Sequence, residues 1–310
     1  MMQTGIVLKS TGKWYEVQDE QGQTIPCQVR GKIRLEGRST TNPVAAGDRV
    51  EFDMNDANEG QIHRILPRKN YIIRKSVNLS KEAQIIAANL DLALLFVTTT
   101  RPQTTHGFID RFLITADAYD IPVEIVFHKI DQYTPDEIEE VNDLQREYEH
   151  IGYVCHRTSI ITGEGLPKLR ERIHGITTLI SGHSATGKSS MINHLIPSKE
   201  IRVGEVSEAS NKGQHTTTFA EMHALPGGGF IVDTPGIKGF GLVDIPKEEL
   251  NHHFVEFFQL LPSCKYHNCM HLNEPGCAVV HAVETGEVSE GRYRSYVSMV
   301  NDEEDRSVYR

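Results

Sequence analysis

Long apolar runs, internal repeats, low-complexity tracts and an excess of basic residues are all missing from this chain of 310 residues. The longest apolar run, around residues 90–97, is far shorter than the roughly 20 residues that cross a bilayer. No apolar stretch follows the opening MMQTGIVLKS, so we expect no secretory signal, no membrane attachment and a cytoplasmic protein. With 38% hydrophobic and 24% charged residues, the composition fits a soluble globular chain of about two or three domains.

Positive charge is scarce, and the net charge of −10 argues against a general nucleic-acid binder. The distribution is uneven, because residues 1–75 hold 12 Lys and Arg against 9 Asp and Glu. In RGKIRLEGR, the two-residue period of a strand puts Arg30, Lys32 and Arg34 on one face. That face is either an ordinary solvated surface or a stripe that contacts the phosphates of a nucleic acid.

Cysteine is also rare, with five residues, yet three of them crowd into CKYHNCMHLNEPGC. The spacing C-x4-C-x-H-x5-C comprises Cys264, Cys269, His271 and Cys277. In a cytosolic chain such a cluster indicates a metal rather than disulfides. Three thiolates and one imidazole leave no open position on a tetrahedral ion, which predicts one structural Zn²⁺ per chain. Lower-ranked alternative ligands are His252, His253 and His267.

The first 72 residues read as five short strands separated by Gly/Asn/Asp-rich turns. These strands are GIVLKS, KWYEVQ, TIPCQVRGKIRL, DRVEFDM and GQIHRILP. Five strands in so short a segment predict a small β-barrel, an OB-fold, over residues 1–72. The following PRKNYIIRKS is interpreted as a basic connector.

Residues 73–245 alternate strand and helix patterns, which predicts an α/β domain with a doubly wound, mostly parallel sheet. DLALLFVTTT has the continuous apolar character of a buried strand. Thr134 is the expected N-cap of a long helix that ends near Gly152. Residues 246–310 are expected to form a zinc-binding α-helical domain, whose terminal helix packs Tyr293, Tyr296 and Met299 or Val300 on the zinc element.

The segment GHSATGKSS satisfies the phosphate-loop pattern G-x-x-x-x-G-K-[ST]. It follows the apolar ITTLIS and opens the helix-like KSSMINHLI, the context that the pattern requires. Backbone N–H groups of such a loop face the phosphates, Lys188 reaches the β- and γ-phosphates, and the Ser189 hydroxyl ligates Mg²⁺. The predicted phosphate-side residues are Gly182, His183, Ser184, Ala185, Thr186, Gly187, Lys188, Ser189 and Ser190.

Two later segments supply further phosphate-side groups. GGFIVDTPG ends a strand with D-x-x-G, so Asp233 is expected to hold Mg²⁺ through its hydration shell and Gly236 N–H to bond the γ-phosphate. Alone, this tetrapeptide is also good turn chemistry. In NKGQHTTTFAEM, Thr216, Thr217 and Thr218 are the candidates for a switch threonine that ligates Mg²⁺. Threonine is also common in β-strands, so the same residues suit the start of a strand.

The tetrapeptide HKID follows the strand-like PVEIVF and resembles the guanine-reading Asn-Lys-x-Asp. Asp131 can accept hydrogen bonds from N1–H and N2–H₂ of guanine, which adenine cannot supply. Lys129 is expected to pack over the base and brace the phosphate loop, and RTSIITGEG offers Thr158 and Ser159 as a second base-side loop. Because these base-side segments precede the phosphate loop, the order predicts a circularly permuted GTPase domain.

A barrel, a permuted GTPase domain and a Cys₃His element in this order resemble the RsgA (YjeQ) family. The segments that carry the resemblance are GDRVEF, IAANLDLALL, IDRFL, GHSATGKSS, GQHTTT, DTPG and CKYHNCMHLNEPGC. The resemblance implies Mg²⁺-dependent GTP hydrolysis, stimulated by the small ribosomal subunit during its late maturation. It further implies that the barrel and the zinc domain contact the 16S-type rRNA, and we expect a monomer.

Two positions depart from that family's pattern, and a third differs from many other GTPases. His128 stands where the family usually has Asn, and Ser159 is followed by Ile160 where the family usually has Ser-Ala. Ile237 replaces the Gln that orients water in many GTPases, so we expect slow intrinsic hydrolysis. His215 is the internal candidate for orienting the water, although it also suits a structural role in a loop.

Two other functions compete with GTP hydrolysis. An rRNA-binding scaffold whose nucleotide site only switches shape is favoured by Ile237 and His128. An ATPase is opposed by Asp131, which discriminates against adenine.

Overall fold

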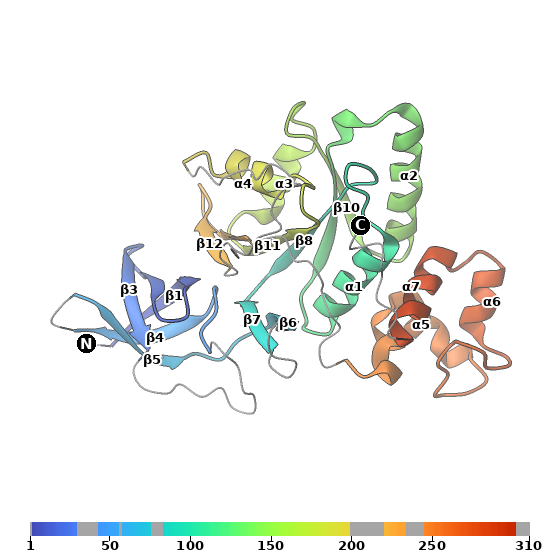
Figure 1. Cartoon of the computed structure of the whole chain (residues 1–310), viewed down its shortest axis with the longest axis horizontal. Coiled ribbons are helices and arrows are strands. Elements are labelled where there is room, and N and C mark those ends of the chain that lie inside the picture. The colour runs from blue at the N-terminus through green and yellow to red at the C-terminus, as the bar shows by residue number, and fades with distance from the viewer. Residues whose placement is uncertain are drawn as a thin grey trace, which may run out of the picture.

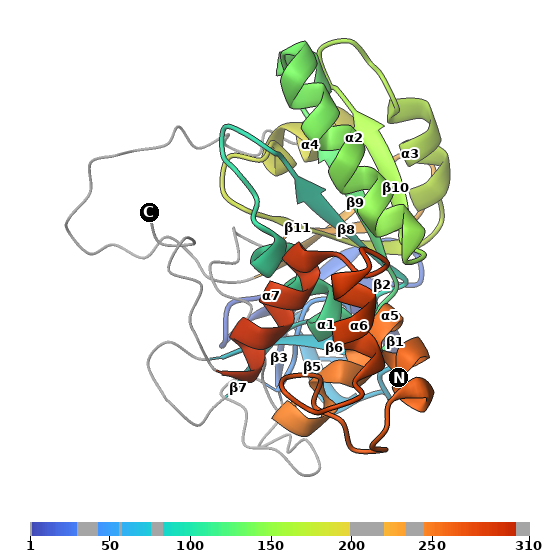
Figure 2. The same cartoon turned by 90° about the vertical axis from the view of Figure 1, so that its right-hand side faces the viewer.

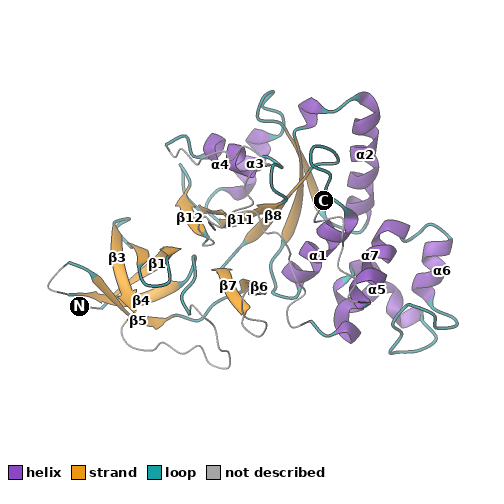
Figure 3. Ribbon diagram, viewed as in Figure 1, coloured by secondary structure: helices purple, strands orange, loops and turns teal. Residues whose placement is uncertain are grey.

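The computed structural model describes residues 2–29, 43–55, 58–75, 83–198, 220–233 and 245–301. Figure 1 shows a strand-rich N-terminal part, a central α/β part and a C-terminal group of helices. Colouring by secondary structure separates the same regions, with strands at one end of the molecule and helices at the other (Figure 3). The three-part architecture expected from the sequence is confirmed.

The N-terminal part is a five-stranded, OB-like barrel. Its strands are β1 (Gln3–Ser10), β2 (Tyr15–Asp19), β3 (Thr24–Val29), β4 (Arg49–Met54) and β5 (Gly60–Ile65). They pair in the order β1-β2-β3-β5-β4, and a β1–β4 pairing closes the barrel. Val7, Val17, Phe52 and Ile62 are fully buried inside it. Alternating burial along β2 and β4 is the period-two pattern of strands with one face on a core.

The connector after the barrel differs from its expected form. Strand β6 (Tyr71–Lys75) lies within PRKNYIIRKS and pairs antiparallel with β7 (Ala83–Ala88), which was not predicted as a strand. Reading this stretch as a mere basic connector was therefore wrong. The partner strand comes from a different segment, so periodicity within PRKNYIIRKS could not reveal the pairing.

The central sheet contains the predicted parallel strands. They are β8 (Leu92–Val97), β9 (Val123–His128), β10 (Val154–Thr158), β11 (Thr177–Gly182) and β13 (Phe230–Asp233), with β12 (Glu221–Ala224) antiparallel to β13. The spatial order is β10-β9-β8-β11-β13-β12, and β12 meets β1 of the barrel at Lys9↔Glu221. Strand β8 is buried throughout, because both faces of the sheet are covered.

Helices lie on both faces of the sheet. They are α1 (His106–Asp117), the 3-10 turn η1 (Ile130–Gln132), α2 (Pro135–His150), α3 (Leu166–Ile173) and α4 (Lys188–Leu195). One core joins Leu95 of β8 to α1 and α2, and another joins the adjacent Leu94 to α3 and α4. Thr134 caps α2 as predicted, accepting from the Glu137 N–H at 3.3 Å in a capping box.

The C-terminal part is helical. Its elements are η2 (Lys247–His253), α5 (Val255–Leu260), η3 (Leu261–Ser263), α6 (Ala278–Glu284) and α7 (Glu290–Val300). Figure 2 shows these helices standing in front of α1, and α1 and α7 are in contact. As expected, Tyr296, Met299 and Val300 share a core with Cys269 and Cys277. Within the residues that the structure describes, every helix is too short or too polar to span a membrane.

Candidate guanine-nucleotide site and metal centre

The phosphate loop connects β11 to α4 through three residues with positive φ. Gly182 has φ +143°, Ala185 +65° and Gly187 +98°. A Cβ atom at Gly182 would lie 2.5 Å from the Phe96 carbonyl oxygen, and one at Gly187 would lie 2.5 Å from His128 Cδ2. Neither position has room for a side chain. A loop of this shape at a helix N-terminus turns successive N–H groups toward a bound anion.

Lys188, the first residue of α4, points back over the loop. Its ammonium donates to the carbonyl oxygens of Gly182, at 2.8 Å, and His183. The Thr186 hydroxyl donates to the same His183 carbonyl at 2.9 Å. Burial lowers the pKa of Lys188 to about 8, while Asp233 acts against this shift. A phosphate placed beside the ammonium would raise this pKa again and strengthen its preference for the charged form.

The remaining predicted loop residues surround this lysine. Ser184 and Ala185 are exposed at the tip of the loop, whereas Thr186 is buried. Ser189 and Ser190 are half-buried in the first turn of α4. The tip of the loop is therefore exposed to solvent.

The base-side segment HKID lies against the phosphate loop. Lys129, with φ +62°, donates from Nζ to the carbonyl oxygen of Ala185 at 2.7 Å. His128 is 2% exposed, and its Nδ1 lies 2.8 Å from Thr158 Oγ1 in the second base-side segment. Burial, with a smaller contribution from Lys129, lowers the pKa of His128 to about 4, so the imidazole is neutral at pH 7. Asp131 is exposed in η1.

Ser159 has a local structural contact that the sequence did not reveal. Its buried hydroxyl oxygen accepts from the N–H groups of Ile161 and Thr162, both at 3.1 Å. These bonds shape the loop that follows β10. The direct partner of His128 is the neighbouring Thr158, which is paired with His128 in the register of β9 and β10.

Asp233 ends β13 beside the phosphate loop. It pairs in register with Ile180 of β11, two residues before Gly182. Burial raises the pKa of Asp233, and Lys188 opposes that rise. The parallel strands therefore bring the base-side and phosphate-side segments to their carboxyl ends, where open α/β sheets bind ligands.

Several predicted site residues lie outside the described residues. They are His215, Thr216, Thr217, Thr218, Gly236 and the three cations Arg30, Lys32 and Arg34. Ile237 lies in the same part of the sequence as Gly236.

The four predicted metal ligands come together. The donor atoms of Cys264, Cys269, His271 and Cys277 all lie within 4.8 Å of one another. His271 Nδ1 is 3.7 Å from Cys264 Sγ and 3.4 Å from Cys277 Sγ. A tetrahedral Zn²⁺ with bonds of about 2.3 Å to sulfur and about 2.0 Å to nitrogen holds such atoms about 3.5 Å apart. The donor set therefore fits zinc.

Neighbouring groups support this metal site. The backbone N–H groups of Ala278 and Val280 donate to Cys264 Sγ and Cys277 Sγ at 3.4 Å. The Asn251 amide lies 3.3 Å from His271 Nε2, the ring nitrogen that stays free when Nδ1 binds a metal. Of the alternative ligands, His253 instead pairs with Asp117 at 2.7 Å. All four ligands come from the protein, which is the arrangement of a structural site.

Comparison with known proteins connects these features to one family. The profile described as RsgA GTPase matches residues 65–243, and that of the RsgA N-terminal domain matches residues 4–62. The chain belongs to the RsgA GTPase family. A relative from Bacteroides fragilis named "Small ribosomal subunit biogenesis GTPase RsgA" is 51% identical over 97% of each chain. A relative of the same name from Christiangramia forsetii is 47% identical over 97% of this chain and 96% of its own.

Two solved structures resemble this chain over nearly its whole length. YjeQ from Thermotoga maritima has a TM-score of 0.79 at 33% identity, covering 97% of this chain and 98% of its own. YloQ, described as a circularly permuted GTPase, has a TM-score of 0.73 at 29% identity, covering 99% and 96%. The permuted order expected from HKID and GHSATGKSS is thereby confirmed for this RsgA-family chain.

Proposed function

We propose that this chain hydrolyses GTP to GDP and phosphate and acts in the biogenesis of the small ribosomal subunit. The Lys129–Ala185 hydrogen bond is the main structural support, because it joins the guanine-reading segment to the phosphate loop. Family membership and the names of the close relatives support the ribosomal role. We propose that the small subunit is the partner, that it stimulates hydrolysis, and that the chain acts late in maturation as a monomer.

On the phosphate side, Lys188 holds the β- and γ-phosphates, together with the N–H groups of residues 182–190. The Ser189 hydroxyl and Asp233 hold Mg²⁺, which when bound neutralises charge on the phosphates. On the base side, Asp131 accepts from guanine, Lys129 covers the ring, and His128 and Ser159 hold the two base-side segments in place. Asp131 is the residue that discriminates against adenine.

The hydrolytic water needs a positioning group, because the Ile237 side chain carries no polar atom that could orient it. We propose His215 for this role, with Thr216 or Thr217 as the switch residue that responds to the γ-phosphate. Slow hydrolysis by the isolated chain, and acceleration when the ribosomal partner is bound, are the expected consequences.

Binding to rRNA is assigned to the barrel stripe of Arg30, Lys32 and Arg34 and to the zinc element. We propose three domains, an OB-fold over residues 1–72, the permuted GTPase domain over residues 73–245 and the zinc-binding domain over residues 246–310. With a net charge of −10, local cationic patches must carry the RNA contacts. Binding should therefore weaken as salt concentration rises.

Phosphate release with and without purified small ribosomal subunits tests the proposal. We expect stimulation by the subunit, loss of turnover in Lys188→Ala and weakened guanine binding in Asp131→Asn, with exposed Lys168→Ala as the matched control. Competition of ATP against GTP excludes or establishes an ATPase. His215→Ala should abolish the stimulated rate, and an unchanged rate would remove His215 from the mechanism.

A scaffold or switch with little hydrolysis of its own is the second candidate, favoured by Ile237. A scaffold of this kind would bind small subunits in a nucleotide-dependent way. Its phosphate release would be no faster than that of the Lys188→Ala variant. The same assay therefore separates the two functions.

A further inference from the structure

Helix α1 contacts the phosphate loop through its first turn. The Phe108 ring stacks on the His183 imidazole, with centroids 3.7 Å apart and planes inclined by 27°. Phe108 is 4% exposed, and its N–H donates to the capping Thr105 hydroxyl at 3.3 Å. Because the His183 carbonyl accepts from both Thr186 and Lys188, a shift of His183 would move the lysine assigned to the phosphates.

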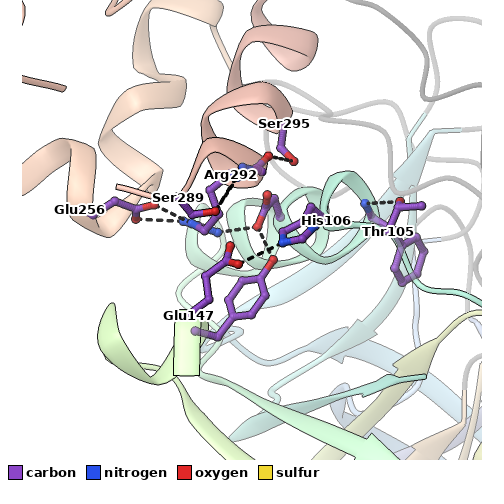
Figure 4. Close-up of polar contacts among 11 residues, drawn as sticks. Thr105, His106, Glu147, Glu256, Ser289, Arg292 and Ser295 are labelled. Atoms are coloured by element: carbon purple, nitrogen blue, oxygen red, sulfur yellow. Dashed lines mark hydrogen bonds and ion pairs between the residues drawn. The ribbon is translucent and has the colours of Figure 1, made fainter. Parts of the chain in front are cut away.

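Two residues further along, α1 is fastened to the C-terminal part. Asp110 is fully buried, pairs with Arg292 of α7, and accepts from the Tyr148 hydroxyl at 2.8 Å. Arg292 is 2% exposed and also holds Glu256 of α5 by two bonds, of 2.5 and 2.9 Å. Figure 4 shows Arg292 between Glu256 and α1. One guanidinium thus joins α1, α5 and α7.

The surroundings leave this guanidinium little freedom. Burial alone would lower the pKa of Arg292, but Asp110 and Glu256 raise it well above its ordinary value, so the group is charged. Its carbon lies 4.8 Å from the Phe254 ring centroid and 5.5 Å from that of Tyr148. Sliding α7 along α1 would leave buried charges without partners, which is strongly unfavourable.

A second contact between α1 and α7 involves His106. His106 opens α1, and its Nε2 lies 3.1 Å from a Glu147 carboxylate oxygen on α2 (Figure 4). A Cβ atom at Gly291 of α7 would lie 3.0 Å from this imidazole, so the α7 backbone packs closely against His106. The position of α1 is therefore set from the C-terminal side at two places.

We propose that Arg292 is a positioning residue for the nucleotide site and acts through α1. Its pair with Asp110 fixes the helix, and Phe108 on that helix holds His183 and the phosphate loop. The inference rests on the proposed binding of guanine nucleotide. Linkage makes the coupling reciprocal, so nucleotide in the loop strengthens the docking of α7 on α1 by the same factor.

Titration of the zinc-loaded, full-length chain with fluorescent GDP tests the coupling. Arg292→Lys keeps the positive charge but loses the paired bonds to Glu256. We expect it to weaken GDP binding by about twofold to thirtyfold. Phe108→Leu keeps apolar bulk but removes the ring stack, and a loss of about threefold to tenfold is expected.

Matched controls separate coupling from general damage. Arg294→Lys lies on the same helix but is exposed, and Phe258→Leu removes an exposed ring from α5. Both should bind GDP like the wild type. In the double variant Phe108→Leu/Arg292→Lys, the two losses should not add, because both act through α1. Additive losses would indicate independent structural damage and overturn the proposal.

Hydrogen exchange of the unmodified chain provides a test that needs no variant. GDP should slow exchange of the amides in α7 as well as in α1. Phe108→Leu should weaken both effects, because the Phe108 ring joins α1 to the phosphate loop. If the wild type binds GDP but α7 exchange does not change, the inference fails while the proposed function stands. If the wild type binds no guanine nucleotide, both fail.

Discussion

His128 lies between Thr158 and the phosphate loop, and burial favours its neutral form. The imidazole contacts Thr158 Oγ1 and borders Gly187, so it is packed between the second base-side segment and the phosphate loop. A pKa near 4 means that folding favours the neutral ring. His128 therefore places an uncharged polar group between the two segments.

This burial predicts a pH dependence of stability. Between an unfolded pKa of about 6.5 and the folded value, the unfolded chain binds the proton more readily, so stability falls as pH decreases. The His128 contribution to the free energy of unfolding should fall by about 2 kcal/mol between pH 7.5 and pH 5. Urea unfolding of wild type and His128→Asn checks this. The exposed His281→Asn is the control, and equal pH slopes for wild type and His128→Asn would contradict the assignment.

Gly187 tests how closely the base-side and phosphate-side segments approach. Its φ of +98° disfavours any side chain, and a Cβ would lie 2.5 Å from His128 Cδ2. Gly187→Ala should weaken nucleotide binding by at least about tenfold and destabilise the chain by about 1–3 kcal/mol. Gly152→Ala is the matched control, because Gly152 has φ +101° but open space around it. Similar stability losses for both would show that strain alone, without the clash, accounts for the effect.

At the scale of elements, the start of helix α2 is stabilised by a capping box. Thr134 and Glu137 form the capping box of α2, and Glu137 also pairs with Arg101 at 2.9 Å. Thr134→Ala should lower the free energy of unfolding by about 1 kcal/mol, whereas Thr134→Ser should be nearly neutral. Thermal or urea unfolding of both variants measures this. A loss equal for Ala and Ser would show that the hydroxyl cap is not responsible.

The elements also show which features a sequence can reveal. The sequence alone was sufficient to predict α2, because its N-cap, its acidic first turn and Gly152 at its end all lie within one segment. The phosphate loop and the Cys₃His cluster were likewise compact in sequence. The β6–β7 pairing, the Phe108–His183 stack and the Arg292–Asp110 pair join residues far apart in the chain or in different elements. Such contacts depend on packing, which no local period encodes.

At the scale of the molecule, the barrel is attached to the α/β part by more than the chain. Besides the β1–β12 pairing, the Asn89 amide donates to the Gly47 carbonyl at 2.9 Å, and Ala88 N–H donates to the Ala46 carbonyl at 2.9 Å. A Cβ atom at Gly47 would lie 2.1 Å from the Ala88 carbonyl oxygen, so the two backbones touch. The α/β part is therefore in contact with the barrel through β12 and β7. On its other side, it is in contact with the C-terminal helices through α1.

Zinc removal tests the C-terminal neighbour. Cys269, Cys277 and Tyr296 share one core, so losing the metal should loosen that core and the docking of α7. We expect one zinc per chain by elemental analysis, its loss in Cys277→Ser, and its retention in Cys155→Ser, where the thiol lies outside the cluster. Cys277→Ser and chelator treatment should both lower the unfolding temperature, because a structural site contributes its binding free energy to folding. Full zinc occupancy in Cys277→Ser, or a chelated chain that unfolds like the untreated one, would show that the Cys₃His cluster does not hold a structural metal.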